Sequence, residues 1–198
     1  HAGAVLVGNT RMSELGFGLA GDTTSRALSE GHADCALVTD TLGEARVAAA
    51  TAGLWGFKPT YGIVSRFGLI GLVPSMESYS VIAANAGVIA PVMQVIAGRD
   101  ERDFSMPDLA IPEFRLDGNG GDAIRHVAVL KESLALLSPE DGKAFLPALS
   151  RLEKAGFSLR EESMAEFDLF RTVHQVVGAV EASSSAGTTM RSIFASTS

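Results

Sequence analysis

The densest group of residues that could do chemistry lies between Thr39 and Arg46, where the chain reads Thr-Asp-Thr-Leu-Gly-Glu-Ala-Arg. Glycine in such a turn lets the backbone approach a substrate in conformations that other residues avoid. The backbone N–H groups can then hold the oxyanion that forms when a nucleophile attacks an amide carbonyl. In this turn Glu44 offers a carboxylate, which is not a useful nucleophile for amide hydrolysis. Leu42 would also block a close approach of the backbone to a substrate.

The residues around this turn resemble the core signature of the amidase signature family. That family carries Ser-Asp-Thr-Gly-Gly-Ser-Ile-Arg, then a helix of small residues, then Gly-hydrophobic-Lys-Pro-Thr-Tyr-Gly. The chain fits this pattern without a gap from Asp40 to Gly62 and continues it in Val64–Gly68. The resemblance is strong from Ala2 to about Asp103 and recognisable through Ala182. It extends to the A subunits of tRNA-dependent amidotransferases, which hydrolyse glutamine to supply ammonia.

The resemblance implies a catalytic triad whose residues are not found here. The family uses a nucleophilic Ser, a second Ser in a cis peptide within Gly-Gly-Ser-Ser-Gly-Gly-Ser, and a Lys on an earlier strand. The nucleophile position is Glu44, the second-serine position falls near Ala20, and the Lys would lie upstream of His1. By the logic of a triad, we expect an amidase-like protein without amide-hydrolase activity, acting as a binding or assembly partner.

The resemblance also implies where a ligand would be held. Thr41, Gly43 and Arg46 belong to the signature turn, and Glu77 stands where the family tends to have an acidic residue that contacts substrate. A small-molecule amide is one ligand that would fit this assignment.

Two alternatives stay open. The chain could be a functional amidase or glutaminase with relocated catalytic residues, for example Ser25 or Thr24 near Glu44. It could also be a decayed fragment with no function of its own.

A metal or cofactor is not expected. His32, Asp34 and Cys35 could be interpreted as metal ligands, but one Cys, one nearby His and no second cluster make a poor site. A turn at a strand edge with a buried Cys explains them better. The histidines His126 and His174 are expected to be packed or surface residues rather than bases.

Composition narrows the class of protein. The 198 residues are 46% hydrophobic and 20% charged, which is typical of a globular chain. The net charge of −7 argues against direct nucleic-acid binding, and no apolar run is long enough to span a membrane. A single Cys excludes an internal disulfide and favours a reducing, cytoplasmic setting.

Apolar runs and helix-capping residues predict alternating strands and helices, hence an α/β fold with a mixed sheet flanked by helices. The expected strands are 4–7, 35–39, 126–130 and 157–160. The expected helices are 24–30, 44–52, 85–97, 139–155 and 167–182, followed by a loosely ordered tail from Ser183. Trp55 and Phe57 are expected in the core, and 58–77 as an ordered loop.

We expect one domain over 1–198, with a signature core at 1–103, a linker-like loop at 104–125 and a second α/β portion at 126–198. Such a chain would lack part of the full family fold. The sheet edge and apolar surface left exposed would then need cover. This predicts a homo-oligomer or a protein partner.

Overall fold

A computed structural model describes residues 2–11, 23–116 and 126–196, with side chains as far as residue 187. The chain divides into two compact units, 1–118 with 177–198, and 119–176. Each unit is described by itself. The division of the chain into functional portions stays a prediction.

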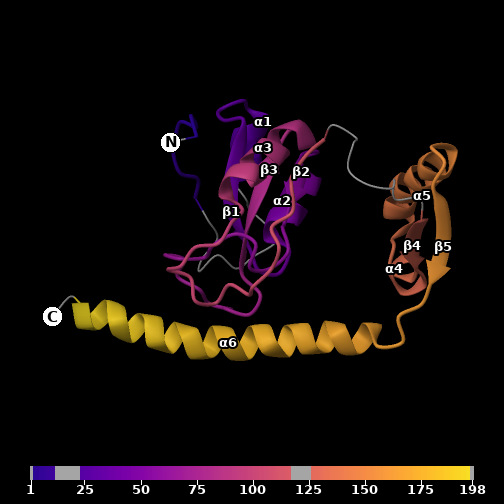
Figure 1. The fold of residues 1–198 in the computed structure, drawn as a ribbon. Coiled ribbons are helices and arrows are strands. Elements are labelled where there is room, and N and C mark those ends of the chain that lie inside the picture. Colours follow the sequence, from indigo (N-terminus) through magenta and orange to yellow (C-terminus); the bar gives the residue numbers. More distant parts are fainter. Residues whose placement is uncertain (1, 12–22, 117–125, 197–198) are drawn as a thin grey trace. The chain divides into compact units, whose positions relative to one another are not determined.

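The first unit is built on a three-stranded antiparallel sheet in the order β1-β3-β2 (Figure 1). The strands are β1 (Cys35–Asp40), β2 (Trp55–Phe57) and β3 (Ser78–Ala83). The helices are α1 (Thr23–Ser29), α2 (Glu44–Thr51), α3 (Ala86–Ile96) and the part of α6 (Phe167–Ser196) from Val177 onward.

The two faces of the sheet have different cover. Because side chains alternate along a strand, Val81 and Ala83 of β3 point to one face and Ile82 to the other. The first face packs against Ile89 and Met93 of α3. The second packs against Ala45 and Ala49 of α2, with Leu28, Val38 and Leu54 around them.

A glycine allows the close packing of α2 on the sheet. A Cβ at Gly56 of β2 would lie 2.9 Å from the Cβ of Ala49 and 3.1 Å from the Cα of Arg46. Both distances are shorter than ordinary van der Waals contact, so the helix can approach this strand only where the side chain is absent. The packing holds the N-terminal end of α2, and with it the signature turn, against the end of β1.

The second unit is a β-α-β arrangement. The strands β4 (His126–Leu130) and β5 (Ser158–Glu162) pair in parallel and are joined through α4 (Lys131–Ala135) and α5 (Pro139–Lys154). Ser138 caps α5 by accepting a hydrogen bond from the N–H of Asp141, with Pro139 at the first helical position.

Helices flanking an antiparallel sheet and a parallel sheet confirm the predicted α/β fold class, but three local predictions are wrong. Residues 4–7 form no strand, and the Val5 and Leu6 side chains are 81% and 84% exposed. The chain from Ser183 continues α6 to Ser196 rather than ending in a loose tail. Trp55 and Phe57 of β2, at an edge of the sheet, are 58% and 36% exposed, so neither lies in the core.

Candidate functional site: the turn between β1 and α2

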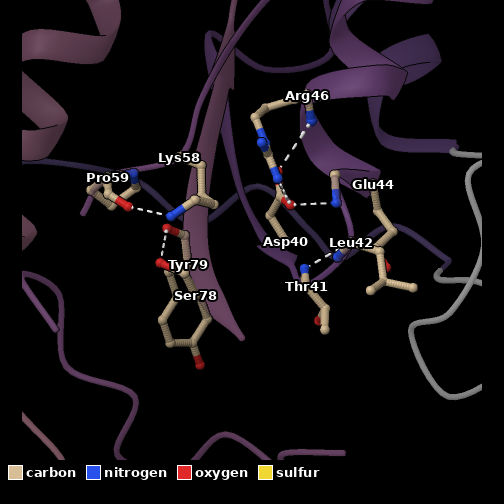
Figure 2. Close-up of polar contacts among 10 residues, drawn as sticks. Asp40, Thr41, Leu42, Glu44, Arg46, Lys58, Pro59, Ser78 and Tyr79 are labelled. Atoms are coloured by element: carbon tan, nitrogen blue, oxygen red, sulfur yellow. Dashed lines mark hydrogen bonds and ion pairs between the residues drawn. The ribbon is translucent and has the colours of Figure 1, made fainter. Parts of the chain in front are cut away.

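The turn is organised by Asp40, the last residue of β1, whose side chain is fully buried (Figure 2). Its carboxylate accepts hydrogen bonds from the N–H of Gly43 at 2.8 Å and of Arg46 at 3.3 Å. The guanidinium of Arg46 donates twice more, from Nε at 2.8 Å and Nη2 at 2.9 Å. Hydrogen bonds to Asp40 raise the pKa of Arg46. Asp40 therefore caps the start of α2 and fixes the arginine across it.

Gly43 supplies the backbone conformation that the turn needs. Its φ is 113°, in the left-handed region that favours glycine. This conformation brings the chain round so that the N–H groups of Thr41 and Leu42 face the first residue of α2.

Glu44 occupies those two N–H groups with its own side chain. Its Oε2 accepts from the N–H of Thr41 at 2.8 Å and of Leu42 at 2.7 Å. The other oxygen, Oε1, is buried and has no hydrogen-bond partner among the described residues. A carboxylate at the start of a helix is also favoured by the helix dipole. The turn thus holds an anion, and the anion is part of the chain.

Glu77 is a second buried carboxylate near Glu44. Its Oε1 accepts from the N–H of Leu72 at 3.1 Å, while Oε2 is buried without a hydrogen-bond partner in the described chain. Burial is the main cause that raises its pKa, and the charge of Glu44 raises it further. The structure therefore brings Glu77 to the vicinity of the turn, but with one oxygen already bonded to the backbone.

Leu42 packs under α6 within the first unit. A Cβ at Gly178 would lie 3.8 Å from the Leu42 Cδ2 atom, so the leucine side chain reaches the helix backbone where that residue is small. The Leu42 side chain therefore extends from the turn to α6.

Lys58 belongs to the same region. Burial, followed by the charge of Arg46, lowers its pKa. Its amine donates to the carbonyl oxygen of Pro59 at 2.6 Å, which ties it to the loop after β2 (Figure 2).

The other candidate site residues lie outside the turn or outside the described residues. Ala20 lies outside the described residues. His32 contacts Glu30, with 3.2 Å between Nε2 and Oε2. Among the described residues no group of three or more His, Cys, Asp and Glu side chains could hold a metal ion. His126 and His174 are exposed.

Sequence reasoning did not assign a role to Asp40, although it sits inside the motif. Four donors converge on its carboxylate, yet they come from residues within six positions of it. The signal that could have found it is the pairing of an acid at the end of a strand with an arginine in the first turn of the next helix.

The fold and the turn define the class of protein: an α/β chain with a glycine turn of the amidase type at the start of a helix. The family model described as Amidase matches residues 24–196, and the chain belongs to the amidase family.

Two curated relatives are glutamyl-tRNA(Gln) amidotransferase A subunits. That of Deinococcus radiodurans is 32% identical, over 92% of this chain and 42% of its own length. That of Natronomonas pharaonis is 31% identical, over 92% of this chain and 49% of its own. The crystal structure of the A subunit from Thermotoga maritima matches with a TM-score of 0.75 at 27% identity, over 88% of this chain and 40% of that one. The chain thus spans less than half the length of these relatives.

Proposed function

We propose that this chain is an amidase-family protein without amide-hydrolase activity, which acts as a binding or assembly partner. The observation that carries the proposal is the Glu44 carboxylate, which lies 2.8 and 2.7 Å from the N–H groups of Thr41 and Leu42. In an acyl-transfer enzyme such donors must be free to receive the oxyanion as it forms. Here the Glu44 carboxylate occupies them, and the same residue stands where the family has its serine.

Occupation of these N–H groups should lower the rate of amide hydrolysis strongly. Loss of one oxyanion donor costs a hydrolase about a hundredfold to a thousandfold in rate. At this turn two donors are engaged, and the engaged group would also repel an oxyanion. A serine at position 44 would restore the hydroxyl, but not the second serine at the Ala20 position.

The alternative, a functional amidase with relocated residues, requires a hydroxyl beside a base. Thr24 and Ser25 are buried, and Thr24 Oγ1 lies 2.6 Å from the hydroxyl of Thr10, which gives it a partner other than Glu44. This arrangement counts against the pair that the sequence offered.

The activity is tested by ammonia release from glutamine and from simple amides, with an active amidotransferase A subunit as the positive control. We expect no release by the wild-type chain or by Glu44→Ser, and no labelling by a serine-directed fluorophosphonate probe. Turnover by the wild-type chain that scales with its concentration would overturn the proposal.

Assembly is supported by apolar side chains on the two edge strands. Leu37 of β1 and Trp55 of β2 are 55% and 58% exposed, on the same side of the sheet as Val81. Exposed apolar residues on edge strands, here one on each edge of the sheet, favour an interface. Relatives are named as subunits, which agrees with a protein partner or a homo-oligomer. In the described part of the chain no helix could cross a membrane. A cytoplasmic location is part of the proposal.

Light scattering tests the assembly of the purified chain. We expect a dimer or larger species whose population falls in Trp55→Ser. Phe104→Ser is the matched control, because Phe104 is 96% exposed and lies on a loop away from the edge strands. A monomer at high concentration would contradict self-assembly, and a Phe104→Ser effect equal to that of Trp55→Ser would remove the edge strands as its cause.

A further inference from the structure

Two oppositely charged side chains of the first unit line one cavity without pairing with each other. The cavity is shallow and open to solvent, with a volume of about 410 Å³, and its lining includes Arg66, Glu181, Tyr61 and the hydroxyl-bearing Ser75 and Ser105. An arginine and a carboxylate at one cavity commonly form an ion pair. Arg66 and Glu181 form no such pair, because other contacts hold each of them.

The guanidinium of Arg66 donates to neutral groups, while the carboxylates of Asp103 and Glu77 lie close enough to act on its charge. Its guanidinium lies over the ring of Tyr61, 4.4 Å from the centroid, and Nη2 donates to Ser105 Oγ at 2.5 Å. Nη1 donates to the carbonyl oxygens of Pro74 and Glu77. These contacts fix the plane of the guanidinium but leave its charge without a carboxylate hydrogen-bonded to it in the described chain.

Glu181 is held from the other side of the same loop. Its Oε2 accepts from the backbone N–H of Ser75 at 3.0 Å. Hydrogen bonds from the backbone and side chain of Ser75 keep the pKa of Glu181 below its ordinary value, so the carboxylate is ionised at neutral pH. No ion pair involves Glu181 within the described residues.

The loop at Pro74 and Ser75 therefore separates the two charges. Arg66 binds the carbonyl on one side of the peptide, and Glu181 binds the N–H of the next residue. A purely anionic ligand at this cavity would be repelled by Glu181, and a purely cationic one by Arg66. A molecule with both charges would meet an opposite charge at each end.

We propose that this cavity binds a small zwitterion, with its anionic group on Arg66 and its ammonium group on Glu181. The hydroxyl groups of Ser75 and Ser105 are already hydrogen-bonded to Glu181 and to Arg66 and Asp103, so they hold the two charged side chains in place rather than binding the ligand. Zwitterion binding at this cavity does not depend on whether the chain hydrolyses amides. A negative binding result therefore leaves the proposed function untouched, and detection of amide hydrolysis leaves the zwitterion site untouched.

Calorimetric titration of the full chain tests the inference with β-alanine, γ-aminobutyrate and taurine as zwitterions. Propionate and propylamine serve as matched probes with one charge each. A hydrogen bond to a charged group favours binding enough to change affinity by about tenfold or more. We therefore expect at least one zwitterion to bind at least about tenfold more tightly than either single-charge probe.

The variants Arg66→Gln and Glu181→Gln should each weaken zwitterion binding by about tenfold or more. Glu181→Gln keeps a carbonyl oxygen that can accept from Ser75, so it removes the charge and retains the contact. Arg99→Gln is the control, because this arginine is 76% exposed and outside the cavity lining. Thermal melts followed by Trp55 fluorescence report whether each variant is folded.

Zwitterions that bind no more tightly than propionate and propylamine would overturn the inference, whatever the variants do. So would folded Arg66→Gln and Glu181→Gln proteins that bind as the wild type does. The comparison among probes uses the wild-type chain alone, so it decides the matter even if a variant fails to fold.

Discussion

Replacing Glu44 with alanine removes the acceptor of two backbone N–H groups and should destabilise the first unit. The N–H groups of Thr41 and Leu42 lie 2.8 and 2.7 Å from Glu44 Oε2. A buried donor left without an acceptor costs about 1–3 kcal/mol. Both contacts are only partly buried, so water can satisfy the donors in part and the lower end applies, about 2 kcal/mol for the pair.

Two features of Glu44 oppose this loss. Its Oε1 is buried without a partner in the described chain, and its charge lies near that of Glu77. Alanine relieves both, so the expected net loss in the free energy of unfolding is about 1–2 kcal/mol. Glu44→Gln keeps an oxygen acceptor and removes the charge. We expect it to lose less than about 1 kcal/mol, chiefly the interaction with the helix dipole.

Urea unfolding followed by Trp55 fluorescence measures these differences, because this tryptophan is unique in the chain and lies in the first unit. Hydrogen exchange adds a local readout: the amides of Thr41 and Leu42 should exchange faster in Glu44→Ala and little changed in Glu44→Gln. Glu30→Ala, at an exposed helical ion pair, is the control. An alanine variant as stable as wild type, with those two amides still protected, would refute the account of Glu44 as the ligand of its own turn.

Three further substitutions probe the same unit. Burial raises the pKa of Glu77, so the wild type loses stability as this carboxyl ionises between about pH 4 and 7. Glu77→Gln has no such loss, so its free energy of unfolding should rise relative to that of the wild type over this range. Equal urea midpoints of the two proteins across the range would contradict this. Asp40→Ala leaves the backbone N–H groups of Gly43 and Arg46 without their acceptor, while the Arg46 guanidinium is 47% exposed and can be hydrated, so the variant should cost about 2–4 kcal/mol in urea unfolding. A loss below about 1 kcal/mol would show that Asp40 does not organise the turn. Gly56→Ala places a methyl 2.9 Å from the Cβ of Ala49 and should lower stability by about 1–3 kcal/mol; an unchanged melting temperature would mean that α2 shifts freely on the sheet.

The helices were the most predictable part of the fold because their starts are coded locally. Ser138 and Asn85 each accept from an N–H three residues on, and both helices begin as the sequence predicts. The central strand β3 was missed because Ser78 and Ser80 interrupt its apolar side chains. For residues 4–7 the sequence predicted a strand that does not form. An apolar run forms a strand only where another strand pairs with it, and an exposed backbone hydrogen-bonds to water instead.

The candidate sites also differ in how far the sequence could predict them. The signature turn lies within eight residues, so its members could be assigned together from the sequence. The Arg66 cavity could not, because Ser75 and Glu181 are 106 positions apart and nothing local in either segment indicates the other. Trp55 was expected inside because it is large and apolar, but it lies on an edge strand whose neighbouring position is open.

The geometry of the turn also explains why its scaffold can persist without its serine. A turn whose backbone N–H groups have no hydrogen-bond acceptor lowers the stability of the fold. Active sites keep such turns because the substrate supplies the acceptor. Glu44 supplies it permanently, with Gly43 and Asp40 keeping the geometry around it. Glutamate at this position thus removes a nucleophile and supplies an anion in one substitution. On this reasoning, the proposed loss of hydrolysis and the stability of the turn have a single cause, and a variant that frees the two N–H groups should weaken the turn before it restores any chemistry.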